Sequence, residues 1–165
     1  MIGMVGGEQK RRHAVNVLGF DACVDHTAAD VEQQLAAAAG DGIDVVFENV
    51  GTPSIDAALP SMKYHGRIML CGLAAHYNSD TVATLRNITM LLHKQISMTP
   101  FAVPEHRDLL PRARRELSEY IKTGAVKYDE TITDGLENAP TAYLDMLAGV
   151  GLGKRLLRIS HQAHG

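Results

Sequence analysis

Short apolar runs alternate with longer helical patterns along most of this sequence. Strand-like runs occupy residues 2–5, 22–24, 43–47, 67–71 and 96–103. Helical patterns occupy residues 8–18, 30–39, 53–62, 81–92 and 104–122. Strands that alternate with helices of this length form parallel βαβ units. The sequence therefore predicts an α/β fold, with a parallel sheet that has helices on both faces.

The strand-like runs are nearly continuous in apolar character. IDVVF (43–47) and RIMLC (67–71) lack the polar–apolar alternation of a half-exposed strand, which indicates strands covered on both sides. In such sheets, ligands bind beyond the carboxyl ends of the strands. Those ends are Gly6-Gly7, Asp25-His26, 49–51 and Cys71-Gly72. We expect them to form one candidate binding surface.

The pattern changes after Gly124. A strand is expected at 126–133, a helix at 136–147, a basic strand at 154–159 and a loose tail at 160–165. The sequence thus predicts a boundary near residue 125, between a segment 1–125 and a segment 126–165.

Composition narrows the class of protein. A length of 165 residues fits one domain, and 45% hydrophobic with 21% charged residues is ordinary for a globular chain. A net charge of -3 gives no electrostatic footprint for nucleic acid or an acidic membrane. Two cysteines make no disulfide framework, and no apolar run reaches the ~18 residues of a membrane helix. We expect a cytoplasmic protein with no nucleic-acid or membrane partner.

A phosphate-binding glycine motif is missing. A dinucleotide-binding sheet normally opens with a strand followed by G-x-G-x-x-G, and the sequence contains no such motif. Gly149, Gly151 and Gly153 follow a helical pattern and precede a strand, the reverse of the required context.

The end of the first strand instead carries cations. In MVGGEQKRR no acid follows the strand directly, and Lys10, Arg11 and Arg12 open the helix. A cation at this place suits the 2′-phosphate of NADP, whereas an acid suits the ribose of NAD. A solvated helix face explains the same residues equally well, so both interpretations stay open.

The sequence gives little support for a metal site or for a nucleophilic cysteine. The eight histidines form no H-E-x-x-H motif, there is no C-x-x-C, and no metal site is expected. Cys71 has no evident cation or helix N-terminus beside it, so a nucleophilic role is not favoured.

Four runs of the sequence resemble a known family. They are LGFDACVDH (18–26), GIDVVFENVG (42–51), GRIMLCGLAAHYN (66–78) and ENAPTAYLDMLAGVGLGKRLLRI (137–159). In order and spacing they resemble the C-terminal half of the zinc-independent medium-chain dehydrogenase/reductases. The most similar group is NADP-dependent and contains prostaglandin reductase, bacterial curcumin reductase and plant alkenal reductases.

The resemblance implies an incomplete Rossmann-like domain. It implies that residues 1–125 lack the first βα unit and the N-terminal GroES-like domain of the family, and that residues 126–165 return to the catalytic domain. In the strand order 3-2-1-4-5-6 the missing strand lies in the middle, so both of its neighbours would carry unpaired edges.

The resemblance also implies cofactor-binding residues, carried over one by one. Lys10 matches the family lysine that meets the NADP 2′-phosphate. His26 stands where the family usually has a tyrosine beside the adenosine, and Asn49 matches an asparagine near the cofactor. Gly151 replaces a family asparagine that contacts the cofactor, which puts that contact in doubt.

Two further segments match the part of the family's cofactor site that binds the nicotinamide. The stretch from Cys71 and Gly72 to Tyr77 matches the family's CGxxxxY, with small residues that let a cofactor approach the backbone. Phe101, Ala102 and Val103 match the strand that faces the nicotinamide. Tyr77 is the candidate catalytic residue, holding the substrate oxygen or the nearby ribose.

The implied function is NADPH-dependent reduction of the C=C bond of α,β-unsaturated ketones and aldehydes, with NADP(H) as the cofactor and a small-molecule enone or enal as the substrate. The alternative is a catalytically inactive remnant that acts as a protein-interaction module. We also expect a homo-oligomer, such as a dimer, formed through exposed sheet edges.

Overall fold

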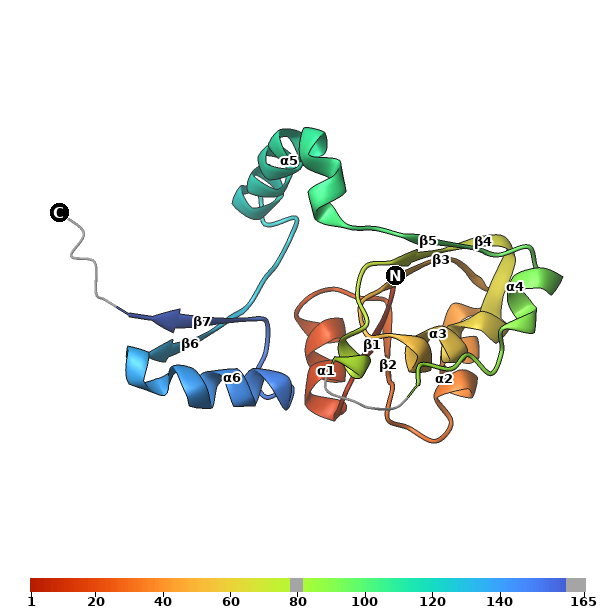
Figure 1. Ribbon diagram of the computed structural model, residues 1–165, viewed down its shortest axis with the longest axis horizontal. Helices are drawn as coiled ribbons and strands as arrows, with labels where there is room; N and C mark the ends of the chain where they lie inside the picture. Colours follow the sequence, from red (N-terminus) through yellow and green to blue (C-terminus); the bar gives the residue numbers. More distant parts are fainter. Residues whose placement is uncertain (78–81, 160–165) are drawn as a thin grey trace. The chain divides into compact units, whose positions relative to one another are not determined.

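The computed structural model describes residues 1–77 and 82–159. The chain divides into two compact units, Met1–Arg115 and Glu116–Gly165. Figure 1 shows the elements of both units.

The first unit contains five parallel strands in two sheets. The strands are β1 (Ile2–Val5), β2 (Ala22–Asp25), β3 (Ile43–Glu48), β4 (Met62–Leu70) and β5 (Ser97–Pro100). One sheet has the order β1-β2 and the other β3-β4-β5, and every pair is parallel. The α/β prediction is therefore confirmed, and the sheet is divided between β1 and β3.

Helices connect these strands. They are α1 (Glu8–Asn16), α2 (Val31–Ala39), α3 (Thr52–Ala58), η1 (Leu59–Ser61), η2 (Ala74–His76) and α4 (Thr89–His93). Strand β5 is followed by η3 (Val103–Leu109) and by α5 (Leu110–Lys122), which contains the boundary between the two units. Pro53 lies in the first turn of α3, where its missing N–H is not needed. Pro111 likewise lies at the beginning of α5, so it marks the start of this helix.

The helix expected at 81–92 is much shorter in the structure. Only α4 is helical, and Thr81 lies outside the described residues. The buried carboxylate of Asp56 accepts the backbone N–H groups of Arg86 and Asn87, each at 3.0 Å. These bonds hold residues 86 and 87 in a turn, because a side chain competes there with the helical ladder for the backbone donors.

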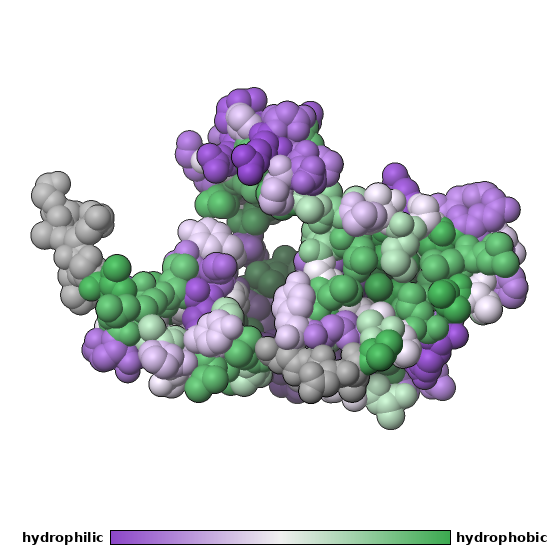
Figure 2. Space-filling model, in the orientation of Figure 1, coloured by the Kyte–Doolittle hydropathy of each residue, from purple (hydrophilic) through white to green (hydrophobic). Residues whose placement is uncertain are grey.

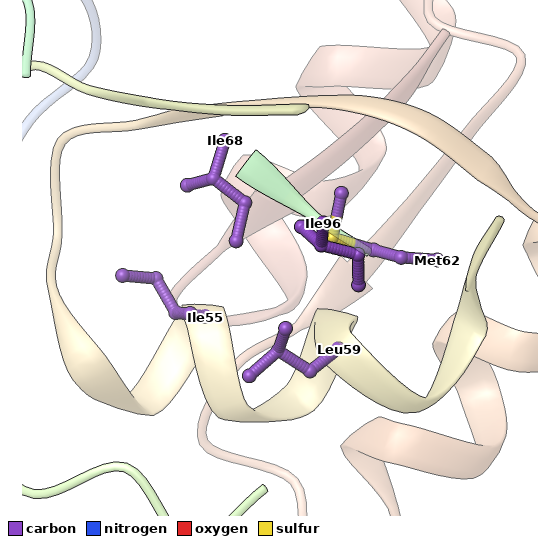
Figure 3. Close-up of a cluster of buried hydrophobic side chains, with 5 residues drawn as sticks. All are labelled: Ile55, Leu59, Met62, Ile68 and Ile96. Atoms are coloured by element: carbon purple, nitrogen blue, oxygen red, sulfur yellow. The ribbon is translucent and has the colours of Figure 1, made fainter. Parts of the chain in front are cut away.

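Helix α3 and its continuation η1 carry the core of the first unit. Ile55 and Leu59 pack with Met62, Ile68 and Ile96 under the sheet β3-β4-β5 (Figure 3). A second cluster joins α3 to α2 and β2; its members are Val24, Leu35, Ala57 and Ala58. A single helix therefore packs against elements of both sheets.

The sequence predicted that β3 is covered on both faces, but one of its faces is exposed in the structure. Val46 packs against the core, but Val45 and Phe47 are 47% and 66% exposed. Successive side chains of a strand point to opposite faces, so these two residues share the face away from α3. Figure 2 shows apolar side chains at the surface of this unit.

The second unit is a small βαβ motif that follows α5. It comprises β6 (Glu130–Asp134), η4 (Leu136–Asn138), α6 (Ala139–Leu147) and the parallel strand β7 (Lys154–Arg158). Strand β6 begins four residues later than the sequence pattern predicts, and the expected tail at 160–165 lies outside the described residues. Ala142 is the one buried apolar residue among the unit's described residues.

No helix within residues 1–77 and 82–159 combines the length and apolar character that crossing a bilayer requires.

Because Leu59 lies in the core, shortening its side chain is expected to destabilise the protein strongly. Leu59 is fully buried, so Leu59→Ala is expected to lower the free energy of unfolding by about 2–5 kcal/mol through lost burial and a residual cavity. Leu92→Ala makes the same chemical change at a side chain that is 79% exposed, and is expected to change stability by less than about 0.5 kcal/mol. Urea unfolding followed by circular dichroism measures both. Equal effects of the two variants would contradict the core assignment.

Candidate functional site

The carboxyl ends of the strands are grouped within each sheet. Because every strand pair is parallel, β1 and β2 end at one edge of their sheet, and β3, β4 and β5 end at one edge of theirs. Helix α2 follows β2 and helix α3 follows β3. Arg86 links the two helices, since it binds Glu32 in the first turn of α2 at 3.2 Å and Asp56 in α3 at 3.5 Å. That the ends of both sheets form one binding surface stays a prediction.

At the end of β1 and β2 the backbone turns closely around His26. A Cβ atom added to Gly6 would lie 3.0 Å from Nε2 of His26, so a larger residue at position 6 would have to displace the imidazole ring. The neighbouring Gly7 has φ +86° and donates its N–H to the carboxylate of Asp25 at 3.0 Å. The pKa of Asp25 is lowered, chiefly because its carboxylate accepts hydrogen bonds from Thr27.

The three cations at the opening of α1 have different surroundings. Glu8 binds Arg11 and Arg12, each at 2.6 Å. These bonds, from Arg11 first and then Arg12, lower the pKa of Glu8 to about 2. The two arginines thus fit a solvated helix face, while the half-buried Lys10 stays a prediction for the 2′-phosphate.

At the end of β3 a buried carboxylate shapes the turn. Glu48 lies on the last position of the strand, and its Oε1 accepts the N–H groups of Val50 at 2.5 Å and Gly51 at 2.7 Å. Its backbone oxygen accepts the N–H groups of Cys71 and Gly72. Sequence reasoning missed Glu48, although an acid at the end of an apolar strand, just before Asn-Val-Gly, was a usable indication.

The loops that follow β3 and β4 hold each other in place. A Cβ atom added to Gly72 would lie 3.0 Å from the backbone oxygen of Asn49, so glycine is needed for this packing. Asn49 also accepts the N–H of Ala74 at 3.1 Å. His76, which the sequence did not single out, lies with Nε2 3.0 Å from Oγ1 of Thr52 at the start of α3. Asn49 and Gly72 are therefore brought together.

Tyr77 and Phe101 complete this end of the surface. The Tyr77 side chain is 71% exposed, and its hydroxyl oxygen accepts the N–H of Leu73 at 3.4 Å. Phe101 donates its N–H to Leu70 at 2.9 Å, and its ring stacks on His106 with centroids 4.7 Å apart. The exposed residues Ala102 and Val103 follow it.

The candidate residues thus form two groups. Lys10 and His26 lie at the ends of β1 and β2; Asn49, Cys71, Gly72, Tyr77, Phe101, Ala102 and Val103 lie at the ends of β3, β4 and β5. Gly151 lies in the second unit, with φ +92°. A glycine at this position has no side-chain amide, so the doubt about the asparagine contact that the resemblance implies stays.

Neither thiol nor metal chemistry gains support at this surface. The Cys71 thiol lies 3.7 Å from the backbone oxygen of Met69. Burial raises the pKa of the other free thiol, Cys23. The part of the chain that the structure describes holds no group of three or more His, Cys, Asp or Glu side chains able to bind a metal ion.

Comparison with known proteins adds independent information. Residues 1–119 match the family described as zinc-binding dehydrogenase. The chain is 39% identical over 170 residues to NADPH-dependent curcumin reductase of Escherichia coli, and 35% identical over 166 residues to 2-alkenal reductase (NADP(+)-dependent) of Nicotiana tabacum. These alignments cover 97% and 98% of the chain, and 48% of each relative.

A solved structure is similar as well. CurA from Vibrio vulnificus in complex with NADPH superposes with a TM-score of 0.89 at 36% identity, over 97% of this chain and 49% of that chain. The chain therefore spans about half the length of the relatives it matches.

Proposed function

Because the chain belongs to the zinc-binding dehydrogenase family, we propose that it is part of an NADPH-dependent oxidoreductase that reduces the C=C bond of α,β-unsaturated ketones and aldehydes. The observation that carries this proposal is the similarity over almost the whole chain to an NADPH-dependent curcumin reductase and an NADP-dependent 2-alkenal reductase. The carboxyl ends of the parallel strands are the place where such a cofactor would lie.

The residues at this edge fit the cofactor in part. Lys10 would hold the 2′-phosphate, and the His26 ring, seated on Gly6, would flank the adenine. Asn49, Cys71, Gly72 and the segment 101–103 would line the nicotinamide end. The sequence has no G-x-G-x-x-G turn for the diphosphate, so this chain supplies the two ends of the cofactor site.

NADPH, when bound, supplies the hydride that is added to the β-carbon of the substrate. The chain's own contribution is to stabilise the negative charge that develops on the substrate's carbonyl oxygen. Tyr77 is suited to this, because its oxygen accepts the Leu73 N–H while its O–H proton can be donated to that carbonyl. Since the tyrosine polarises the carbonyl, we propose a zinc-independent reaction.

The same proposal includes a cellular setting and an assembly. A cytoplasmic, reducing environment suits an enzyme with two free cysteines and a need for NADPH. The outer edge of β5 is available for pairing with a second copy, because among the described strands β5 pairs with β4 alone.

The first test is a titration of the purified chain with NADPH, followed by nucleotide fluorescence. We expect saturable binding, with NADH binding at least about tenfold more weakly because it lacks the phosphate that Lys10 would meet. Reduction of an enone is then assayed at saturating NADPH. A chain that is folded by circular dichroism but does not bind NADPH would contradict the proposal that this chain alone retains the cofactor site.

An inactive interaction module is the second candidate function. The observation that favours it is the pair of strands, β1 and β3, that each lack a neighbour on one side within the described structure. Absence of NADPH binding together with tight association with another polypeptide would favour this candidate.

A further inference from the structure

The short helix η2 rests on the turn that follows β3. Ala74 donates its N–H to the backbone oxygen of Asn49 at 3.1 Å, and Ala75 donates its N–H to that of Val50 at 2.8 Å. Both alanines are exposed, whereas the third residue of η2, His76, is half-buried. His76 is therefore the residue of η2 whose side chain can add to these two backbone bonds.

The imidazole of His76 lies against the start of α3. Its Nε2 is 3.0 Å from Oγ1 of Thr52, and the N–H of Thr52 donates to the same nitrogen at 3.4 Å. A Cβ atom added to Gly51 would lie 2.8 Å from Cδ2 of the ring and 2.9 Å from Nε2. The ring thus packs directly on the backbone of Gly51, and a side chain at position 51 would displace it.

The bond from Thr52 indicates which nitrogen of the ring carries the proton. A backbone N–H can only donate, so Nε2 of His76 accepts and carries no proton. In a neutral imidazole the proton is then on Nδ1. Nδ1 is buried and has no hydrogen-bond partner within residues 1–77 and 82–159. Because Nε2 is occupied and Nδ1 is shielded, we expect His76 to contact neither cofactor nor substrate.

The place of Tyr77 depends on the place of η2. Tyr77 follows His76 directly, and its N–H donates to the backbone oxygen of Ala74 at 3.4 Å. Its hydroxyl accepts the N–H of Leu73, also at 3.4 Å. Both bonds are long and join Tyr77 to its own loop, so they do not fix the hydroxyl relative to the strand ends. The contacts of η2 with the turn after β3 and with α3 do so.

We propose that His76 is a positioning residue for Tyr77. The bare Nε2 of its ring accepts from Thr52, holds η2 on the first turn of α3 and thereby sets where the Tyr77 hydroxyl lies. This role rests on the proposed function, because the Tyr77 hydroxyl is the group that would meet the substrate oxygen. Misplacing a catalytic group by about 1 Å can cost about a hundredfold in rate, so an anchor beside Tyr77 has a catalytic consequence.

Two substitutions at position 76 form a matched pair. His76→Asn and His76→Gln both replace the ring by a side-chain amide. The longer glutamine can place its carbonyl oxygen near the position of Nε2 and accept from Thr52, whereas asparagine is too short to do so. His93→Asn makes the shorter replacement at an exposed histidine of α4 and should be neutral. Circular dichroism verifies that all three variants fold.

Hydrogen exchange of the chain without nucleotide measures how firmly η2 is held. We expect the Ala75 amide to exchange at least about fivefold faster in His76→Asn, as the loss of one hydrogen bond gives, and to stay within about twofold in His76→Gln. The Cys71 amide donates to the backbone oxygen of Glu48 at 2.8 Å, at the base of the loop. Its exchange should change less than about twofold in both variants.

The role of Nε2 also has a spectroscopic signature. Nitrogen NMR spectra of the imidazole, recorded above neutral pH, should show a proton on Nδ1 and none on Nε2. Thr52→Val removes the hydroxyl partner and should shift the Nε2 signal, whereas Thr52→Ser should leave it in place. The amide signal of Leu73, whose acceptor is the Tyr77 hydroxyl, should move in His76→Asn and stay in His76→Gln.

Turnover of an enone tests the catalytic consequence. At saturating NADPH, we expect His76→Asn to lower kcat about tenfold with an NADPH affinity within about twofold, and His76→Gln to restore most of kcat. A chain that does not bind NADPH would contradict the proposed function. The exchange and NMR measurements need no nucleotide, so they would still decide whether His76 holds η2.

Several results would overturn this role of His76. Equal exchange of the Ala75 amide in the two position-76 variants would show that the Nε2 acceptor holds nothing. A protonated Nε2 would contradict the bond from Thr52. An unmoved Leu73 amide signal in His76→Asn would show that Tyr77 is placed without His76, and an unchanged kcat in His76→Asn would remove the catalytic consequence.

Discussion

Replacing Lys10 with glutamate is expected to weaken NADPH binding by about tenfold to a hundredfold, and to leave NADH binding within about twofold. A hydrogen bond to a charged group contributes about 1.5–3 kcal/mol, and the substitution also places a negative charge beside the phosphate. NADH lacks the 2′-phosphate, so its contacts are unaffected. Fluorescence titrations of the chain with both nucleotides, at low and high salt, measure the effect.

A charge-matched control separates a local contact from general electrostatics. Lys122→Glu, in the last turn of α5, changes the net charge by the same amount at an exposed residue that is not among the candidate cofactor-binding residues. It is expected to leave the preference for NADPH intact. If Lys122→Glu and Lys10→Glu have equal effects, Lys10 does not contact the phosphate.

Replacing Tyr77 with phenylalanine is expected to lower the turnover of an enone about a hundredfold, because it removes one donor to the developing oxyanion. Turnover of the enone by the chain is measured at saturating NADPH. The melting temperature should stay the same, because Tyr77 is largely exposed and its hydroxyl bonds only weakly, at 3.4 Å, to the Leu73 amide of a loop.

The nucleotide affinity of this variant shows where the hydroxyl acts. If NADPH affinity is unchanged while turnover falls, the Tyr77 hydroxyl contacts the substrate. If NADPH affinity is weakened, the hydroxyl contacts the ribose of the cofactor. Tyr64→Phe removes a hydroxyl from another exposed tyrosine, in β4, and should be neutral. Full activity of Tyr77→Phe would exclude a catalytic role for this residue.

The fold could be predicted from the sequence because strand and helix patterns alternate regularly along it. Five strands were located within a few residues, and the apolar character of 43–47 correctly predicted a strand of a parallel sheet. The prediction of a helix at 81–92 was wrong over most of its length because of a tertiary contact. Asp56 on α3 binds the backbone at residues 86 and 87. No local pattern contains that information.

The candidate site could be predicted from the sequence only in part. The sequence correctly placed these glycines and polar residues at the ends of strands. It did not show that Gly72 is required by the backbone of Asn49, or that Glu48 and His76 tie the loops together. These roles depend on contacts between loops that are far apart in sequence. The cofactor and catalytic roles of the candidate residues stay predictions.

The unpaired edges and the thinly covered second unit also bear on the fate of this chain in a cell. Exposed apolar surface and free strand edges are the features that chaperones and proteases act on. When the 165 residues are expressed by themselves, we therefore expect chaperones to bind them and proteases to degrade them rapidly.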